Sequence, residues 1–211
     1  MKTAASALLI SATILLGSYS FAADNATRTQ RIEVRGVEEI EIEGGVGSMD
    51  IERAAGTEML IELEIKAERG WFGRRRNIDD IDLEIIKRGD RLIVKVNEQD
   101  LDDIELHWHV QLPEVDRTSI NLGVGQIIAE VGNTELRVDL GVGEAKIRAP
   151  LAHAGRVEAS AGVGSASISG ANDLVSNRAF VSESVYGYGN STKRIEVNVG
   201  VGDVVVQLSS N

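Results

Sequence analysis

The tripeptide Gly-Val-Gly occurs five times in this sequence, and the alternation of apolar residues changes phase at every copy. Around the copy at 141–143, Val138, Leu140 and Val142 share one side of an extended chain, whereas Ala145 continues on the opposite phase. A straight strand would expose one of these sets to water, because successive side chains point to opposite faces. The chain must therefore turn, bulge or bend at each copy. We predict structural corners at Gly45, Gly47, Gly123, Gly125, Gly141, Gly143, Gly162, Gly164, Gly200 and Gly202.

Glycine pairs can also cradle phosphate groups, but the residues that follow each tripeptide do not fit that use. A dinucleotide site needs a third glycine and a helix whose amino terminus faces the pyrophosphate. Four of the copies run into QIIAEV, EAKIRA, SASIS and DVVVQL, which are typical of strands. The tripeptides therefore predict bends in strands, and no cofactor is expected.

Strict alternation over most of the chain, as in MLIELEIKAE at 59–68, predicts an all-β protein. Copies that start at positions 123, 141 and 162 are spaced about as far apart as the coils of a solenoid. We favour a single-stranded right-handed β-helix-like solenoid with Gly-x-Gly corners. An antiparallel β-sandwich of hairpins stays open, because a two-residue hairpin turn also exchanges the phase. Gly187-Tyr188-Gly189 is a candidate sixth, degenerate copy.

Composition restricts the partners and the source of stability. The net charge is −11, which disfavours nucleic acid and anionic membranes as partners. The chain has no cysteine, so we expect its stability to come from packing and not from disulfides. Only 4% of the residues are aromatic, which predicts an aliphatic core.

The amino terminus is typical of an exported protein. Lys2 precedes a short apolar run, and small residues follow at Ser20 and Ala22. This order predicts a signal peptide at 1–22 that is cleaved after Ala22. We expect residues 23–211 to form one β-helical domain, without a transmembrane segment, that is periplasmic or secreted.

The segment IELHWHVQLPEVDRTSINLGVGQIIAEV carries a family resemblance. A strand ends at Leu112-Pro113, a short polar link follows, and strand-Gly-x-Gly-strand units repeat toward the carboxyl end. This pattern, from about Ile32 to Leu208, resembles the bacterial "putative adhesin" domains, also called toast-rack or head-GIN domains and similar to auto-transporter adhesins. The resemblance implies a β-helix-like fold in exported or envelope-attached proteins, with no established catalytic residues. The irregular stretch at 172–192 departs from the pattern.

One basic and aromatic segment is a candidate binding surface. ERGWFGRRRNIDD lies between two alternating strands and places aromatic side chains beside arginines in an acidic protein. Such a cluster could dock an envelope glycan, a lipid headgroup or a protein. Alternatively, its aromatics fold back onto the core and its arginines pair with nearby aspartates. The candidate binding residues are Trp71, Phe72, Arg74, Arg75 and Arg76.

Weaker signals concern metal binding and catalysis. In ELHWHVQL, Glu105, His107 and His109 share one face of a strand and could begin a zinc site, although a polar outer face is the simpler interpretation. His153 could join them only if the fold brings it close. No nucleophile motif occurs, so we expect a protein that is not an enzyme.

These observations favour an exported, non-enzymatic binding scaffold of the cell envelope, similar to an adhesin. A β-helical enzyme that acts on polysaccharides is the alternative, because some polysaccharide lyases and hydrolases are β-helices with catalytic acids on the outer faces of the coil. A small periplasmic metal-binding protein is a third hypothesis.

Overall fold

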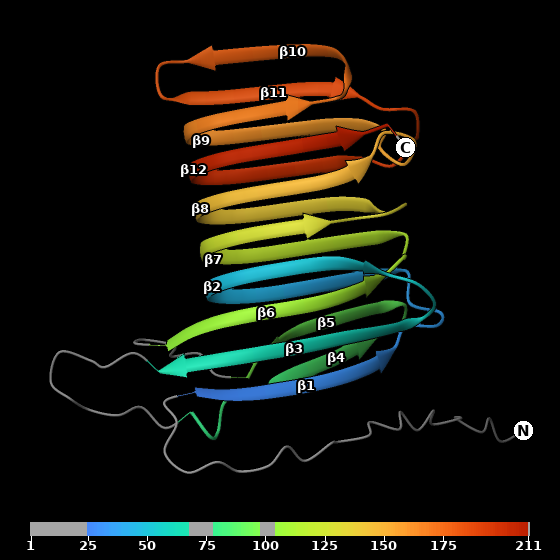
Figure 1. Cartoon of the computed structure of the whole chain (residues 1–211), viewed down its shortest axis with the longest axis vertical. Coiled ribbons are helices and arrows are strands. Elements are labelled where there is room, and N and C mark those ends of the chain that lie inside the picture. Colours follow the sequence, from blue (N-terminus) through green and yellow to red (C-terminus); the bar gives the residue numbers. More distant parts are fainter. Residues whose placement is uncertain (1–24, 68–77, 98–103, 211) are drawn as a thin grey trace, which may run out of the picture.

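The computed structural model describes residues 25–67, 78–97 and 104–210, and all twelve regular elements in these ranges are β-strands. The all-β prediction is therefore confirmed. The strands form one mixed sheet that folds over into two layers (Figure 1). In chain order they are β1 (Asn25–Glu33), β2 (Glu39–Ala54), β3 (Glu58–Ala67), β4 (Leu83–Arg88), β5 (Arg91–Val96), β6 (Ile104–Pro113), β7 (Arg117–Glu130), β8 (Glu135–Pro150), β9 (Arg156–Ser169), β10 (Asn172–Ala179), β11 (Ser182–Tyr188) and β12 (Ile195–Ser209).

The core lies between the two layers and follows from the alternation of side chains. In β3, Met59, Ile61, Leu63 and Ile65 are fully buried, and the residues between them face outward or stay partly exposed. Trp108 on β6 is the largest fully buried side chain, and most of the rest of the core is aliphatic. Burial of such side chains contributes about 25 cal/mol per Å² of apolar surface.

Five strands carry a Gly-Val-Gly copy near their middle and bend there, namely β2, β7, β8, β9 and β12. The second glycine of every copy has a φ angle between 134° and 141°, a region that residues with a Cβ atom rarely adopt. Each bent strand has a first arm before the tripeptide and a second arm after it, and the arms belong to different layers (Figure 1). The predicted corners are therefore present.

The bent strands stack in parallel in the order β2, β7, β8, β12, β9. Between β7 and β8 the register runs from Arg117 opposite Glu135 to Glu130 opposite Arg148, on both sides of the bend. The arms of a hairpin would pair antiparallel with each other, whereas these arms pair in parallel with the neighbouring strands. The tripeptides are thus bends in continuous parallel strands.

The last strand of the chain does not occupy the last place in the stack. β12 lies between β8 and β9 and pairs in parallel with both. β11 then pairs antiparallel with the first arm of β9, and β10 pairs antiparallel with β11. The irregular stretch noted in the sequence is this hairpin. At the other end, β6, β3 and β1 extend the layer of second arms, and β5 and β4 extend the layer of first arms.

The predicted sixth copy of the repeat was wrong. Gly187 lies inside β11, where it pairs with Val157 and is buried. Neither Gly187 nor Gly189 has a positive φ angle. The antiparallel hairpin replaces a further bent strand at this end of the stack.

Candidate binding surface

Both glycines are required at the corners of β7, β8, β9 and β12, and the second glycine is required at that of β2, because the stacked backbones approach closely. A Cβ atom on Gly143 would lie 1.7 Å from the carbonyl oxygen of Gly125 on the neighbouring strand. A Cβ atom on Gly141 would lie 2.4 Å from the carbonyl oxygen of Gly123. The glycines therefore permit both the bend and the stacking, and the valine between them is the only side chain at the corner.

That valine points outward, which corrects the prediction that it shares the core face with the residues before it. The five corner valines are 44% to 47% exposed, whereas Leu140, two residues before Val142, is 3% exposed. The phase change itself is confirmed, since Leu140 and Ala145 are both buried. The alternation breaks at the first glycine, one residue earlier than the sequence interpretation assumed.

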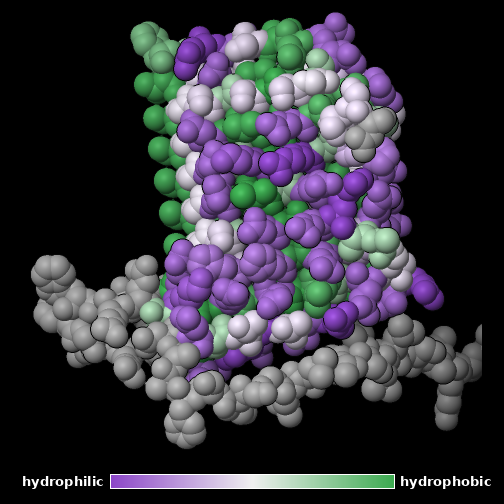
Figure 2. Space-filling model, viewed as in Figure 1, coloured by the Kyte–Doolittle hydropathy of each residue, from purple (hydrophilic) through white to green (hydrophobic). Residues whose placement is uncertain are grey.

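The corner valines form a straight row, which we call the valine ridge. Val46 is opposite Val124, Val124 opposite Val142, Val142 opposite Val201, and Val201 opposite Val163. The ridge follows the edge where the two layers meet, visible as a column of hydrophobic residues at the left of Figure 2.

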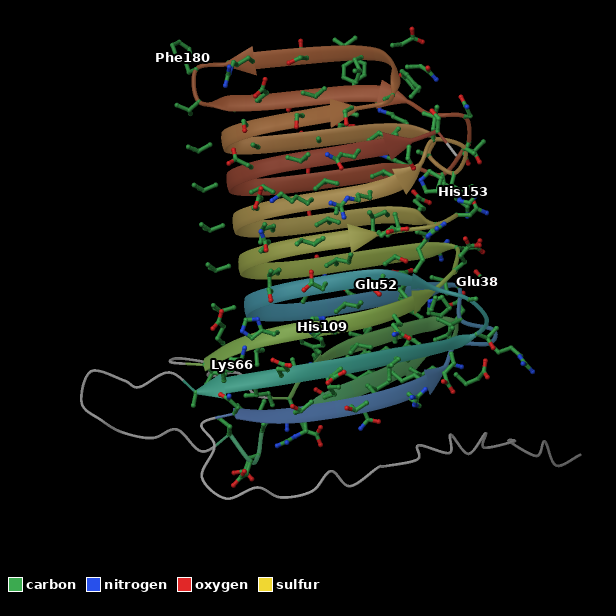
Figure 3. The ribbon with its side chains drawn as sticks, viewed as in Figure 1. Glu38, Glu52, Lys66, His109, His153 and Phe180 are labelled. Carbon is green, nitrogen blue, oxygen red and sulfur yellow. The ribbon has the colours of Figure 1, made fainter. Side chains whose placement is uncertain are left out.

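The turn between β10 and β11 extends the ridge with two further apolar side chains. Phe180 is fully exposed and Val181 is 61% exposed. The backbone of Val181 accepts a hydrogen bond of 3.0 Å from the N–H group of Gly164, which fixes this turn against the last corner. Phe180 stands at the same edge as the valines (Figure 3).

The residues that flank the ridge are polar, and those described on its two sides include no lysine or arginine. On the side of the first arms they are Glu43, Asn121, Asp139, Asn198 and Ser160, and on the side of the second arms they are Ser48, Gln126, Glu144, Asp203 and Ser165. Several bond to each other across strands. Gln126 donates to Glu144 at 2.9 Å, and Ser165 donates to Asp203 at 2.6 Å from its hydroxyl.

These hydrogen bonds lower the pKa values of two acids beside the ridge. The hydrogen bonds from the hydroxyl and backbone N–H of Ser165 hold the pKa of Asp203 below its ordinary value. Lys146 and Gln126 together lower the pKa of Glu144. Both carboxylates are therefore charged at neutral pH and are already satisfied within the chain.

A shallow hollow of about 570 Å³ lies beside the upper part of the ridge, on the layer of first arms. Its floor is the backbone around Gly141, Gly200 and Gly162, which have no side chains to fill it. Polar groups surround it: Asn198 donates to Asp139 at 3.1 Å, and the hydroxyls of Ser160 and Ser184 are 3.0 Å apart. The ridge and this hollow together form an apolar edge with a polar, hydrogen-bonding side.

The predicted aromatic and basic cluster lies outside the described residues. Trp71, Phe72, Arg74, Arg75 and Arg76 all fall within 68–77. That binding site stays a prediction.

The two histidines of β6 point to the outer face of the second-arm layer. His107 Nδ1 lies 2.8 Å from Ser48 Oγ, and its Nε2 lies 3.4 Å from Glu105. His109 Nδ1 is 3.9 Å from Asp50. His153 lies in the turn after β8, at the far edge of the molecule from His109 (Figure 3). Over the described residues no three histidines or acids are arranged to hold a metal ion. The structure therefore offers no set of ligands in support of the zinc hypothesis.

Sequence reasoning missed the acidic surroundings of His109, because they come from three strands. Asp50 on β2 and Glu62 on β3 are its direct neighbours in register. A hollow of about 180 Å³ opens here, lined also by Glu52 and Gln111. Only the pairing of β2, β6 and β3 brings these side chains together, and no sequence spacing signals it.

A solved structure is similar to most of this chain. It is a protein from Clostridium sporogenes named "putative cell adhesion protein", with a TM-score of 0.52 and 19% identity over 88% of this chain and 100% of that chain. At this identity the likeness shows the fold alone. A "putative adhesin" from Bacteroides fragilis, with a TM-score of 0.22 and 10% identity over 87% and 97% of the two chains, carries no argument.

No family model matches the chain, and neither does any curated protein. Among the described residues, no helix has the length and apolar character that a membrane span requires. The chain thus shares its fold with a protein named for cell adhesion.

Proposed function

We propose that this protein is an exported, non-enzymatic binding scaffold of the cell envelope, similar to an adhesin, and that the valine ridge is its contact surface. The observation that carries the proposal is the exposure of an identical apolar side chain at five stacked corners. Soluble proteins expose scattered apolar residues, but a continuous apolar row is characteristic of interaction surfaces. Serine or asparagine would satisfy the same corner without exposing hydrocarbon.

The fold supports a role in presentation. We infer that the stacked bent strands are coils of a flattened, right-handed β-helix-like solenoid, since parallel strand connections are right-handed in nearly all proteins. Such a stack repeats the same corner at each level and holds the ridge straight and rigid. The likeness to the protein named for cell adhesion supports the same function, as does the signal peptide predicted at 1–22, which would deliver residues 23–211 to the periplasm or beyond.

The hollow beside the ridge supports a partner with polar groups next to an apolar strip, such as an envelope protein or glycan. Asp139, Asn198 and Ser184 supply acceptors and donors there. The segment with Trp71 and Arg75 is a second contact under the same proposal.

Binding of the purified protein to an immobilised envelope fraction from its own organism tests the proposal. We expect the triple variant V124S/V142S/V201S to lose at least about tenfold in affinity, which corresponds to about 1.4 kcal/mol. Its melting temperature should stay close to that of the parent, because the valines are exposed.

The matched control is V175S, which changes a valine of similar exposure, 40%, on β10 outside the ridge. Equal binding by the parent and the triple variant would refute the ridge as the contact surface.

A further inference from the structure

We propose that the partner of the valine ridge is the ridge of a second copy of this protein, so that two molecules associate edge to edge in antiparallel orientation. This inference rests on the proposed function, because it names the partner of the same surface. It is carried by the period of the ridge, by the symmetry that allows the valines to interlock, and by the area that the edge offers.

The period of the ridge matches few partners. Neighbouring valines are one strand apart, about 4.8 Å, so the five span about 19 Å. Side chains on one face of a bound β-strand repeat at about 6.7 Å, and the turns of a helix repeat at about 5.4 Å. Either partner would lose register within a few valines. A second copy of the ridge has the same period and stays in register along its whole length.

Symmetry selects the antiparallel arrangement. If two ridges ran parallel about a two-fold axis along the stack, valines at equal height would meet head to head. A two-fold axis perpendicular to the stack lets each valine enter the gap between two valines of the other copy and still closes the dimer. Dry interdigitation of identical side chains with this spacing is the packing of steric zippers.

The antiparallel arrangement also provides a contact for the exposed aromatic end. The row runs from Val46 through Val142 and Val201 to Val181, so its centre lies between Val142 and Val201. The valines interlock when the two-fold axis passes between these two residues, a quarter of the spacing from Val142. Phe180 of one copy would then pack beside Val46 of the other. This contact removes from water the most exposed large apolar side chain of the described residues.

The available area indicates a weak dimer. Five valines at somewhat under half exposure, with Val181 and Phe180, offer roughly 600 Å² per copy, near the lower limit for a specific interface. Two of the four flanking acids oppose association little, because Asp139 is paired with Arg137 at 2.7 Å and Glu144 with Lys146 at 2.8 Å. Weak pairs become strong contacts when many molecules on two surfaces meet.

Disulfide trapping tests the orientation, since the chain has no cysteine of its own. Under mild oxidation the variant V142C should form covalent dimers, because Val142 lies at the centre of the proposed contact. The variant V46C is the matched control and should stay monomeric. Its counterpart in the second copy lies at the opposite end of the ridge, about 22 Å away. Equal trapping of both variants, or trapping of V46C alone, would overturn the antiparallel dimer.

Sedimentation of the purified parent protein tests the association itself. We expect a reversible monomer–dimer equilibrium with Kd on the order of 100 μM, which V124S/V142S/V201S abolishes. A parent protein that stays monomeric up to about 1 mM would overturn the inference. If that monomer still bound the envelope fraction through its valines, the proposed function would stand with a different partner.

Discussion

At the scale of single residues, the fold depends on positions where a Cβ atom has no room. The second glycine of each corner combines a positive φ angle with direct contact to the carbonyl of the neighbouring strand. Either demand alone favours glycine, and together they exclude every other residue type without a backbone shift. The same five corners leave their valines in water, so the residues that build the fold also create its most distinctive surface.

Replacing Gly143 with alanine separates these two demands. Gly143→Ala should lower the free energy of unfolding by at least about 3 kcal/mol, because the new methyl group meets the carbonyl of Gly125. Gly36 also has a positive φ angle, 73°, but has open space around it, so Gly36→Ala should cost only about 1 kcal/mol. Chemical denaturation measures both. Similar losses in the two variants would mean that the corners carry no steric constraint.

The corner glycines were predictable from the sequence, but the direction of the valine was not. Four residues separate Leu140 from Ala145, and both ends face the core. The phase must therefore reverse somewhere between them, and the alternation does not say on which side of Val142. Only the stacked backbones, which turn the corner at the first glycine, settle that the valine faces water.

At the scale of strands, polar side chains tie neighbouring strands together beside several corners and at the ends of the stack. Ser165 on β9 donates to Asp203 on β12 through both its hydroxyl and its backbone N–H. Arg28 on β1 donates to the carbonyls of Ile81 and Asp79, and the backbone N–H of Ala166 donates to Glu183. Arg28 thus places a charge on the edge strand β1, and Glu183 places one beside the second arm of β9, which is the open edge at the other end of its layer. Charges at open edges discourage pairing with other chains.

The bond between Ser165 and Asp203 predicts a pH dependence with a definite sign. The folded pKa of Asp203 is below its ordinary value of 3.8, so this contact stabilises the folded state above that pH. The stabilisation is lost as the pH falls through the lowered pKa. At pH 6 Asp203→Asn should have a lower free energy of unfolding than the parent. This difference in stability, the gap, should close as the pH falls below about 3.8.

Denaturant unfolding at a series of pH values measures this gap. Ser165→Ala should show a smaller convergence of the same sign, because it removes the hydroxyl donor to Asp203 and keeps the backbone N–H donor. A gap that stays constant from pH 6 to pH 3 would show that the carboxylate contributes nothing through its charge.

At the scale of the whole molecule, the sequence predicts the kind of structure but not its order. Alternation and an aliphatic composition indicate an all-β protein with corners. The fold is similar to that of a protein named for cell adhesion. The insertion of β12 between β8 and β9 could not be predicted, because all five Gly-Val-Gly strands carry the same pattern. Locally they are interchangeable, so nothing in the sequence says that β12 lies between β8 and β9 and that the hairpin β10–β11 lies beside β9.

The candidate site was predictable only in part, because the valine ridge depends on how the strands stack. The segment with Trp71 and Arg75 attracts attention in sequence because its residue types are unusual, and it lies outside the described residues. The valine ridge consists of ordinary residues that are 18 to 78 positions apart where they are neighbours. It becomes a surface only when the strands stack in register.

The central claim is that the five corner valines face water in one row, and thiol reactivity tests it most directly. Each valine would be replaced singly by cysteine in this cysteine-free chain, with Leu140→Cys as the buried control. We predict that, at concentrations at which the protein is monomeric, all five ridge cysteines of the native protein are modified much faster than the cysteine at 140, which is protected. Protection at the five valine positions comparable to that at 140 would place them in the core and contradict the account.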